Sequence, residues 1–229
     1  DILIPNEEQL ENDGEVSDSI MKKIIENDLF GISIPKNYGG LGLSMKEQIL
    51  LTFEFTRASA VYRSRFSTTI GLCSQALLDF GTDKQKEKYL PLMASGKAVG
   101  SFALTEPNAG SDALSLETSA IKDGDDYIIN GTKKYITNAP YADVFLVMAK
   151  TNPNSEGSEA ISSFLVDSNL SGIEIGETPK MLGQKGSSSP EVYFQNCRVN
   201  KDALLGEKEG GGLKPALRGI NHARLHVAG

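Results

Sequence analysis

The sequence predicts an α+β fold in which a helical region is followed by a β region and then by the start of a second helical region. Apolar residues recur at helical spacing over residues 1–97. Apolar runs bounded by Gly, Pro and Asn fill the middle, and helical spacing returns after a glycine-rich segment. We therefore expect an all-α domain over 1–97, an antiparallel, barrel-like β domain over 98–205, and an incomplete helical domain over 206–229.

In the helical region, side chains that can cap helices precede the apolar repeats. Ser17 precedes a predicted helix that reaches Leu29, and Ser44 with Glu47 forms an S-x-x-E capping box. Further helices are expected over 68–78 and after Thr82. The side chains expected to face inward are Ile20, Ile24, Ile25, Leu29, Ile49, Leu50, Phe53, Tyr89, Leu90 and Leu92.

In the β region, buried strands are expected where apolar residues run without interruption. These runs are 144–148, 163–166 and 192–194. Asp123-Gly124 and Asn130-Gly131 are both typical of tight turns between strands.

The composition excludes several classes of protein. The chain has 229 residues and a net charge of -7, which argues against nucleic acid or an anionic membrane surface as the main partner. No apolar run is long enough to span a bilayer, and no signal peptide is recognisable. We therefore expect cytoplasmic localisation, or the mitochondrial matrix for a eukaryotic source. Cys73 and Cys197 are expected to be reduced and buried.

The densest motif is the run from Ala103 to Asp112, A-L-T-E-P-N-A-G-S-D. Pro107, Gly110 and the adjoining Asn, Ser and Asp residues predict an exposed loop after a strand that ends at Thr105. Such a loop offers hydroxyl and backbone N–H groups suited to a pyrophosphate or to carbonyl oxygens. The alternative is an ordinary loop that only connects two strands.

Several ordered segments resemble the acyl-CoA dehydrogenase family, and the resemblance covers nearly the whole chain. The residues from Ala103 to Ser115 resemble the first signature of that family. The other matching segments are Ile34-Pro35 with Tyr38-Gly39-Gly40-Leu41-Gly42, Phe80-Gly81-Thr82 with Tyr89-Leu90-Pro91, and Tyr127-Ile128-Ile129-Asn130-Gly131 with Lys133 and Tyr135-Ile136-Thr137-Asn138.

The resemblance implies FAD as cofactor. The positions that match the flavin-binding segments are Phe102, Ala103, Leu104, Thr105, Gly110, Ser111, Tyr135, Ile136 and Thr137. By resemblance, Thr105 would bind the flavin pyrimidine ring, Gly110 and Ser111 the pyrophosphate, and Thr137 would reach towards N5. Tyr135 occupies a position where the family often has Trp; its alternative is a simple cross-strand aromatic. Donors at the pyrimidine end would stabilise the charge left by a hydride arriving at N5.

For the substrate, Ser111, Ser158, Asn221 and Arg224 match family positions that contact acyl-CoA. Asn221 replaces an Asp that is frequent there, which keeps a polar contact but changes its charge. Arg224 can pair with an anionic ligand or a carboxylate. His222 and His226 share a helix face, but no further ligand accompanies them, so no metal site is predicted.

No catalytic base is assigned within the chain. One branch of the family places a Glu directly before the arginine, where this sequence has Ala223, and the other places it in the final helical domain. We therefore expect the base downstream of Gly229, and Glu106 is expected to shape the flavin loop.

The resemblance implies an FAD-dependent dehydrogenase that forms a 2-enoyl-CoA from an acyl-CoA thioester. An electron-transfer flavoprotein is its expected acceptor, and a homodimer or homotetramer its expected assembly. An acyl-CoA oxidase, or another flavin oxidase on the same fold, is the first alternative. A non-catalytic relative is the second. Acyl chain length stays open.

Overall fold

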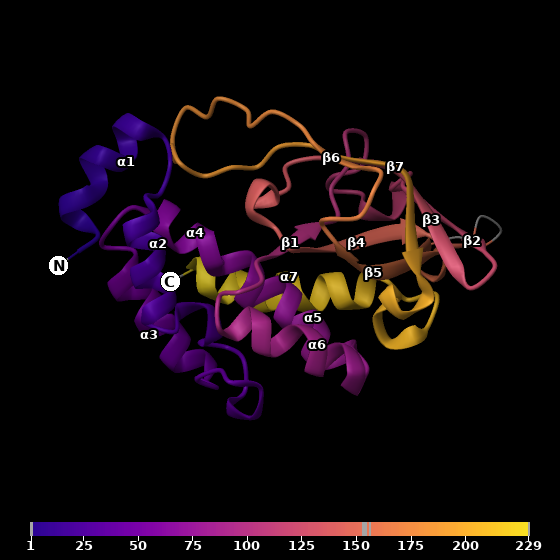
Figure 1. Cartoon of the computed structure of the whole chain (residues 1–229), viewed down its shortest axis with the longest axis horizontal. Coiled ribbons are helices and arrows are strands. Elements are labelled where there is room, and N and C mark those ends of the chain that lie inside the picture. The colour runs from indigo at the N-terminus through magenta and orange to yellow at the C-terminus, as the bar shows by residue number, and fades with distance from the viewer. Residues whose placement is uncertain (1, 153–154, 156, 229) are drawn as a thin grey trace.

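The computed structural model describes residues 2–152, 155 and 157–228. A helical half and a β half lie side by side, and the last helix runs back along the sheet to the helical half (Figure 1). The α+β class and the helix–sheet–helix order predicted from the sequence are confirmed. The exact domain boundaries at 97/98 and 205/206 stay predictions.

The helical half consists of short helices. They are α1 (Glu7–Asp13), α2 (Asp18–Glu26), α3 (Met45–Phe55), α4 (Ala60–Thr68), α5 (Ser74–Phe80) and α6 (Asp83–Ala94). The capping box at Ser44 and Glu47 is present, and Thr82 forms a second box with Gln85. Each box satisfies backbone N–H groups that would otherwise have no partner at the helix start.

The predicted buried face of α3 is wrong. Leu50 and Phe53 are exposed, whereas Gln48 and Thr52 are buried. Both polar side chains find local partners, because Gln48 donates to the Leu43 carbonyl and the Thr52 hydroxyl donates to the Gln48 carbonyl. Apolar residues occur around most of this helix, so their periodicity does not identify the inward side. Ile25 and Leu92 are likewise more exposed than predicted.

Helices α4 and α5 are one continuous helix with a π-helical turn at Thr69–Cys73. The final helix, α7 (Leu213–Ala228), crosses this turn closely. A Cβ atom added at Gly71 would lie 3.4 Å from the Ala223 Cβ, and one added at Gly219 would lie 3.2 Å from the Leu72 carbonyl oxygen. Small residues at the crossing therefore let the two helices approach.

The β half is a curled sheet. Its strands are β1 (Gly100–Ala103), β2 (Ser119–Asp123), β3 (Asp126–Lys133), β4 (Val144–Lys150), β5 (Ile161–Asp167), β6 (Ile173–Ile175) and β7 (Val192–Asn200). Among the described residues the order is β1-β4-β2-β3-β7-β6, with β5 paired to β4. The three predicted apolar runs are strands β4, β5 and β7.

The sheet is mixed and not purely antiparallel, which corrects the predicted strand directions. Strand β1 runs parallel to β4, with Gly100 opposite Val144, and Ser119 of β2 pairs in parallel with Lys150. Turn signals report only pairings between consecutive strands. The parallel pairs join strands that are separated in the chain, so no turn motif announces them.

The two predicted turns have different outcomes. Asp123-Gly124 does turn the chain between β2 and β3, where Gly124 has a φ of +64°. Asn130-Gly131 instead lies inside β3, at an irregularity in its pairing with β7. A Cβ atom on Gly131 would lie only 2.4 Å from the Thr118 hydroxyl oxygen, and its φ is +153°. The glycine therefore serves close packing and a bulge rather than a hairpin turn.

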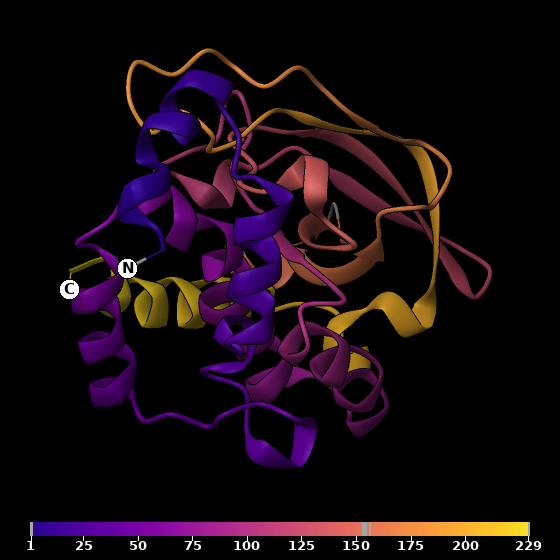
Figure 2. The same cartoon turned by 60° about the vertical axis from the view of Figure 1, so that its left-hand side comes forward.

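A long segment between β6 and β7 reaches across the molecule to α1 (Figures 1 and 2). Lys185 lies 3.4 Å from the Glu11 carboxylate, and Gly186 approaches the side chains of Leu10 and Val61. The β half therefore contacts the first helix directly.

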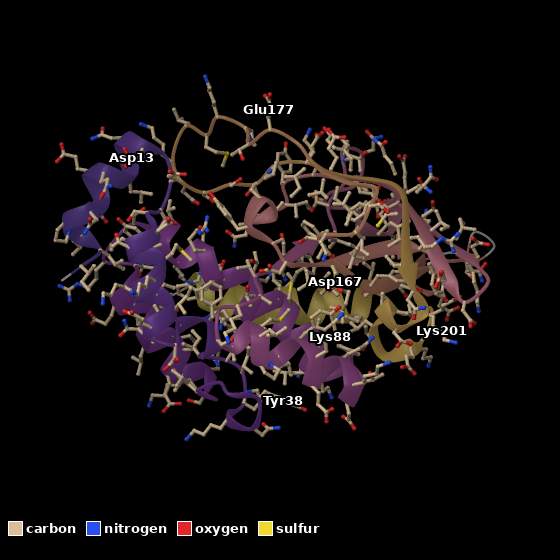
Figure 3. All side chains as sticks on the ribbon, in the orientation of Figure 1. Asp13, Tyr38, Lys88, Asp167, Glu177 and Lys201 are labelled. Atoms are coloured by element: carbon tan, nitrogen blue, oxygen red, sulfur yellow. The ribbon has the colours of Figure 1, made fainter. Side chains whose placement is uncertain are left out.

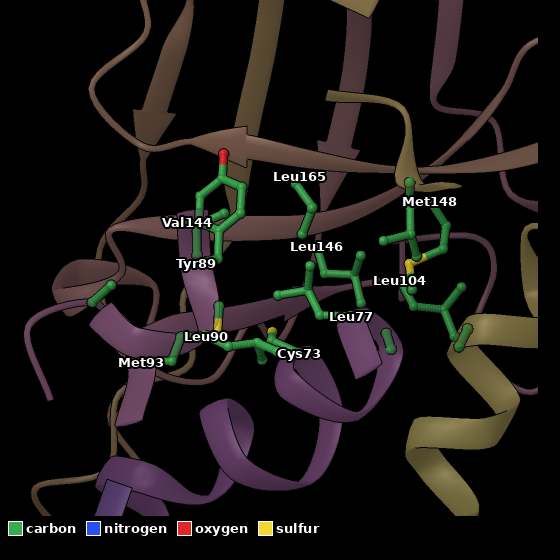
Figure 4. Packing of buried hydrophobic residues seen from close by; sticks show 14 of the residues in the cluster. Cys73, Leu77, Tyr89, Leu90, Met93, Leu104, Val144, Leu146, Met148 and Leu165 are labelled. Atoms are coloured by element: carbon green, nitrogen blue, oxygen red, sulfur yellow. The ribbon is translucent and has the colours of Figure 1, made fainter. Parts of the chain in front are cut away.

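The core joins the two halves. Leu77 and Leu90 of the helices pack against Leu146 and Leu165 of the sheet (Figure 4). At its border, Lys88 lies 3.0 Å from Asp167, whose other oxygen accepts the Tyr89 hydroxyl (Figure 3). Cys73 and Cys197 are buried free thiols, as predicted, and burial raises the pKa of Cys73 to about 12. Across the part of the chain that the structure describes, no helix combines the length and the apolar character needed to cross a bilayer.

Candidate functional site

The residues after β1 form a tight turn that ends in an exposed loop. Glu106 and Ala109 exchange both backbone hydrogen bonds, at 2.9 and 3.3 Å. Gly110 and Ser111 follow and are exposed, and their amides have no hydrogen-bond partner among the described residues. Two adjacent amides without partners are suited to bind an anion such as a phosphate.

A buried ion pair lies behind this loop. The Lys133 ammonium group is 2.7 Å from Glu106 Oε1, and the two side chains are 0% and 3% exposed. Lys133 also donates to the Leu104 carbonyl, and Glu106 accepts the amides of Glu117 and Thr118. Burial lowers the pKa of Lys133 to about 8, against the attraction of Glu106. Burial alone would raise the pKa of Glu106, but Lys133 and the hydrogen bonds lower it.

The segment after β3 presents an aromatic ring. Tyr135 is 63% exposed and has a φ of +59°, a conformation that bulky residues rarely adopt. The preceding Lys134 amide donates to the Thr105 carbonyl at 2.8 Å, so this segment lies directly beside the Thr105 loop. Strained backbone of this kind is concentrated at functional sites.

Asn138 fastens this segment to the helical half. It has a φ of +65°, and its side-chain amide donates to the Ser64 carbonyl at 2.7 Å and to the Thr68 hydroxyl at 2.9 Å. The Ser101 hydroxyl of β1 also donates to the Thr137 carbonyl at 2.6 Å. The segment from Tyr135 to Asn138 is therefore held from both halves of the molecule.

The structure places the predicted cofactor residues at different depths. Gly110, Ser111 and Tyr135 are exposed, and Phe102, Thr105 and Thr137 are half-buried. Ala103, Leu104 and Ile136 are buried, so they can meet a ligand only through their backbone. The Thr137 hydroxyl lies 3.0 Å from that of Ser189. These groups are of the kinds that FAD would need. The Thr105 hydroxyl could bind the flavin pyrimidine, the amides of Gly110 and Ser111 could bind the pyrophosphate, and the exposed Tyr135 ring could pack against the flavin ring system.

A cleft of about 1170 Å³ lies next to the loop. It is lined by Ser111, by Ser158, and by residues between 205 and 217, which belong to the connection after the sheet and to the start of α7. The two predicted substrate-binding serines are thus on one surface, although 158 and 111 are far apart in the chain. Lys208 and Lys214 line the same cleft and have no ion-pair partner within the described ranges.

The other two predicted substrate residues lie elsewhere. The lining of the cleft on α7 extends only to Leu217, whereas Asn221 and Arg224 come later on the helix and are exposed. Arg224 donates to the Asn221 side-chain oxygen at 3.2 Å. The structure therefore brings Ser111 and Ser158 together but does not bring the α7 pair to them.

The two histidines of α7 stack, with ring centroids 5.2 Å apart. His226 is 1% exposed, and neither of its ring nitrogens has a hydrogen-bond partner among the residues that the structure describes. Burial, followed by the charges of His222 and Arg63, lowers the pKa of His226 to about 4. In the described part of the chain, no three side chains of His, Cys, Asp or Glu gather as a metal site would require.

The sequence did not assign a role to Asn138 or to the charge of Lys133. An Asn that follows an apolar run and adopts a left-handed conformation is a recognisable signal, since Asn tolerates positive φ. For Lys133 the available signal was its inward position in the alternation along β3.

The comparisons with known proteins agree on one family. Residues 1–97 match the N-terminal domain and residues 101–197 the middle domain described for acyl-CoA dehydrogenases. An acyl-CoA dehydrogenase of Bacillus subtilis is 39% identical over 99% of this chain and 59% of its own length.

Solved structures of acyl-CoA dehydrogenases also resemble the chain, over nearly its whole length. Butyryl-CoA dehydrogenase from Megasphaera elsdenii has a TM-score of 0.93 and 32% identity, covering 99% of this chain and 60% of its own. A glutaryl-CoA dehydrogenase from Mycobacterium smegmatis, in complex with FADH2, has a TM-score of 0.89 and 31% identity over 99% and 56%.

The chain thus spans about 59% of the length of the first of these relatives. Its two matched domains follow one another as in that family, and its fold superposes on members of it over nearly every residue. Through its N-terminal and middle domains, the chain belongs to the acyl-CoA dehydrogenase family.

Proposed function

We propose that this chain supplies the FAD- and thioester-binding part of an acyl-CoA dehydrogenase, which removes hydrogen from the α and β carbons of an acyl-CoA to give a 2-enoyl-CoA. The observation that supports this most directly is the shared cleft. Ser111, at the end of the predicted flavin segment, lines the same cleft of about 1170 Å³ as Ser158. A ligand in that cleft would reach the cofactor loop.

The residues then have separate tasks. Thr105 would bind and orient the pyrimidine end of the flavin, where its half-buried hydroxyl strengthens a hydrogen bond. The amides of Gly110 and Ser111 would hold the pyrophosphate, and the Tyr135 ring would cover one side of the site and limit access of water. When bound, FAD would accept the β hydrogen as a hydride.

The proton from the α carbon requires a base, which dehydrogenases of this chemistry take from a carboxylate. Ala223 occupies the position directly before Arg224 and cannot serve. We propose that the base, part of the flavin site and the contacts of a homodimer or homotetramer come from residues beyond these 229. This chain alone should then bind FAD weakly.

The test uses the full-length native protein loaded with FAD. A panel of acyl-CoA thioesters is added without oxygen while the visible absorbance of the oxidised flavin is followed. Loss of that band with one class of thioester would support the proposal and identify the substrate class. A band that persists with every thioester, in protein with bound FAD, would contradict it and favour a non-catalytic relative or another flavin substrate.

A second measurement separates a dehydrogenase from an oxidase. The dehydrogenase should pass its electrons to an electron-transfer flavoprotein and consume little oxygen during turnover. Stoichiometric oxygen consumption without that acceptor would instead assign an acyl-CoA oxidase.

A further inference from the structure

The buried pair of Glu106 and Lys133 has contacts that concentrate on the backbone around the predicted cofactor residues. Lys133 donates to the carbonyl of Leu104, which directly precedes Thr105, at 3.1 Å. Glu106 directly follows Thr105. The Thr105 carbonyl itself accepts the amide of Lys134, the neighbour of Lys133. The backbone is therefore held on both sides of Thr105: Lys133 binds the carbonyl of the residue before it, and Glu106 is the residue after it.

We propose that Glu106 and Lys133 are positioning residues that hold the Thr105 hydroxyl and the Gly110–Ser111 amides in place before the cofactor binds. This inference rests on the proposed FAD site and adds to it the residues that preorganise it.

Stability alone is a poor explanation for the pair. Removing two charges from water is costly, and well-packed apolar side chains often replace a buried ion pair without loss of stability. The hydrogen bonds of Glu106 go to the amides of Glu117 and Thr118, which begin the chain's return from the loop towards β2. The pair thus ties the two ends of the loop together.

The pair acts through position rather than through net charge. The ammonium and carboxylate groups are only 2.7 Å apart, so seen from farther away their opposite charges nearly cancel. The pair would therefore exert little electric field on a bound flavin. A hydroxyl that misses its partner by about 1 Å loses much of the interaction, so a loop without these ties should bind FAD less tightly.

The experiment measures the dissociation constant for FAD in four variants of the full-length protein, stripped of cofactor and titrated by flavin fluorescence. Lys133→Met keeps the length of the side chain without the charge. Glu106→Gln keeps the shape and an oxygen acceptor, so it is the variant that preserves the fold best. The double variant removes both charges. Val199→Ala removes buried volume at the far end of the sheet and controls for a general loss of stability.

We expect Glu106→Gln, Lys133→Met and the double variant each to weaken FAD binding about tenfold or more. The double variant should recover much of the stability that Lys133→Met loses, because no carboxylate is left without its cation. Its FAD affinity should stay low. In cofactor-free Glu106→Gln protein, the Lys134 amide should also exchange its hydrogen faster, since the loop that accepts it is loosened.

Three results would overturn the inference. The first is wild-type affinity in the double variant after its stability is restored. The second is wild-type affinity and unchanged exchange at Lys134 in Glu106→Gln. The third is an equal loss of affinity in Val199→Ala at matched stability, because the pair would then be only structural. A wild-type protein that does not bind FAD would instead overturn the proposed function itself, so the two failures are distinguishable.

Discussion

The two sides of the candidate site are built differently. One side, here called the pinned edge, consists of residues 104–106 and 133–138. The other, the open edge, consists of the cleft lining at 111–114, at 158–159 and between 205 and 217. The pinned edge is held by a buried ion pair and by the Asn138 side chain. The open edge carries exposed side chains at Ser111, Ser158, Lys208 and Lys214, and no ion pair joins its segments within the described residues.

This difference corresponds to the two ligands proposed for the site. A cofactor that stays bound gains from a rigid, preformed surface, since little conformational freedom is lost on binding. A substrate that enters and leaves on every turnover needs a surface that can open. Local stability should therefore be high at the pinned edge and low at the open edge. Four predictions test this comparison.

The largest effect is expected for Glu106→Leu at the pinned edge. The substitution leaves the buried ammonium group of Lys133 without its counter-ion and two amides without partners, so the free energy of unfolding should fall by about 3–5 kcal/mol. Urea unfolding measures this change. Glu191→Leu is the matched control, because its partner Lys134 is about one-third exposed, and such a pair contributes about 1 kcal/mol or less. Equal losses in both variants would show that the buried pair contributes no more to the pinned edge than the partly exposed one.

The next prediction concerns pH and the helix that continues from the open edge. The folded-state pKa of His226 is about 4, below its ordinary value of 6.5, so the folded state binds this proton less tightly than the unfolded state. Stability should thus be complete above about pH 6.5 and fall by up to about 3 kcal/mol as the pH drops towards 4.

Unfolding measured across that range should show the slope in wild-type protein, and His226→Phe should flatten it. Parallel slopes in the two proteins would mean that other groups cause the acid sensitivity. Because His226 lies near the end of α7, hydrogen exchange in acid should increase first at the backbone amides around His222 and His226.

Asn138→Ala should lower the free energy of unfolding by about 1–3 kcal/mol, because the carbonyl of Ser64 and the hydroxyl of Thr68 lose their donor. Thermal unfolding measures the shift. Asn138→Gly separates the two causes, since glycine accepts the φ of +65° but supplies no amide. A glycine variant as stable as wild type would assign the cost to backbone conformation and not to the hydrogen bonds.

The smallest effect on stability is expected at the open edge. Ser158→Ala should change the free energy of unfolding by less than about 0.5 kcal/mol, because the residue is exposed. Binding of a CoA thioester to the full-length protein should weaken about fivefold, the value of one hydrogen bond. Ser171→Ala, at an exposed serine outside the cleft lining, should affect neither quantity. Unchanged thioester affinity in Ser158→Ala would remove Ser158 from the proposed substrate site.

The sequence predicted those parts of the fold that depend on neighbouring residues. The buried runs of β4, β5 and β7, the capping box of α3 and the start of α6 at Thr82 were found because their signals are local. The parallel pairing of β1 with β4 was missed because it has no local signal. The inward face of α3 was missed because the buried polar side chains of Gln48 and Thr52 each donate to a nearby backbone carbonyl, which apolar periodicity does not reveal.

In the candidate site, too, local motifs were predictable and contacts between distant segments were not. Ser111 and Ser158 were named from the resemblance, and the cleft joins them. The buried ion pair behind the loop was harder to predict. Lysine is rarely buried unless it is paired, so Lys133 was unremarkable until Glu106 was placed beside it by the fold. A pair that forms between distant segments is visible only once those segments meet.

The π-helical turn at Thr69–Cys73 has a consequence for sequence change in this chain. A turn of this kind holds one residue more than an α-helical turn would. Five residues in such a turn complete about the same rotation as four α-helical residues, so the turn absorbs the extra residue and Leu77 beyond it keeps its buried place against the sheet. Deleting one residue in this turn should therefore leave a regular helix with Leu77 facing the same way, whereas the same deletion in a regular α-helix would rotate everything after it by about 100°. A loss of one residue should thus be tolerated better at Thr69–Cys73 than in the other helices.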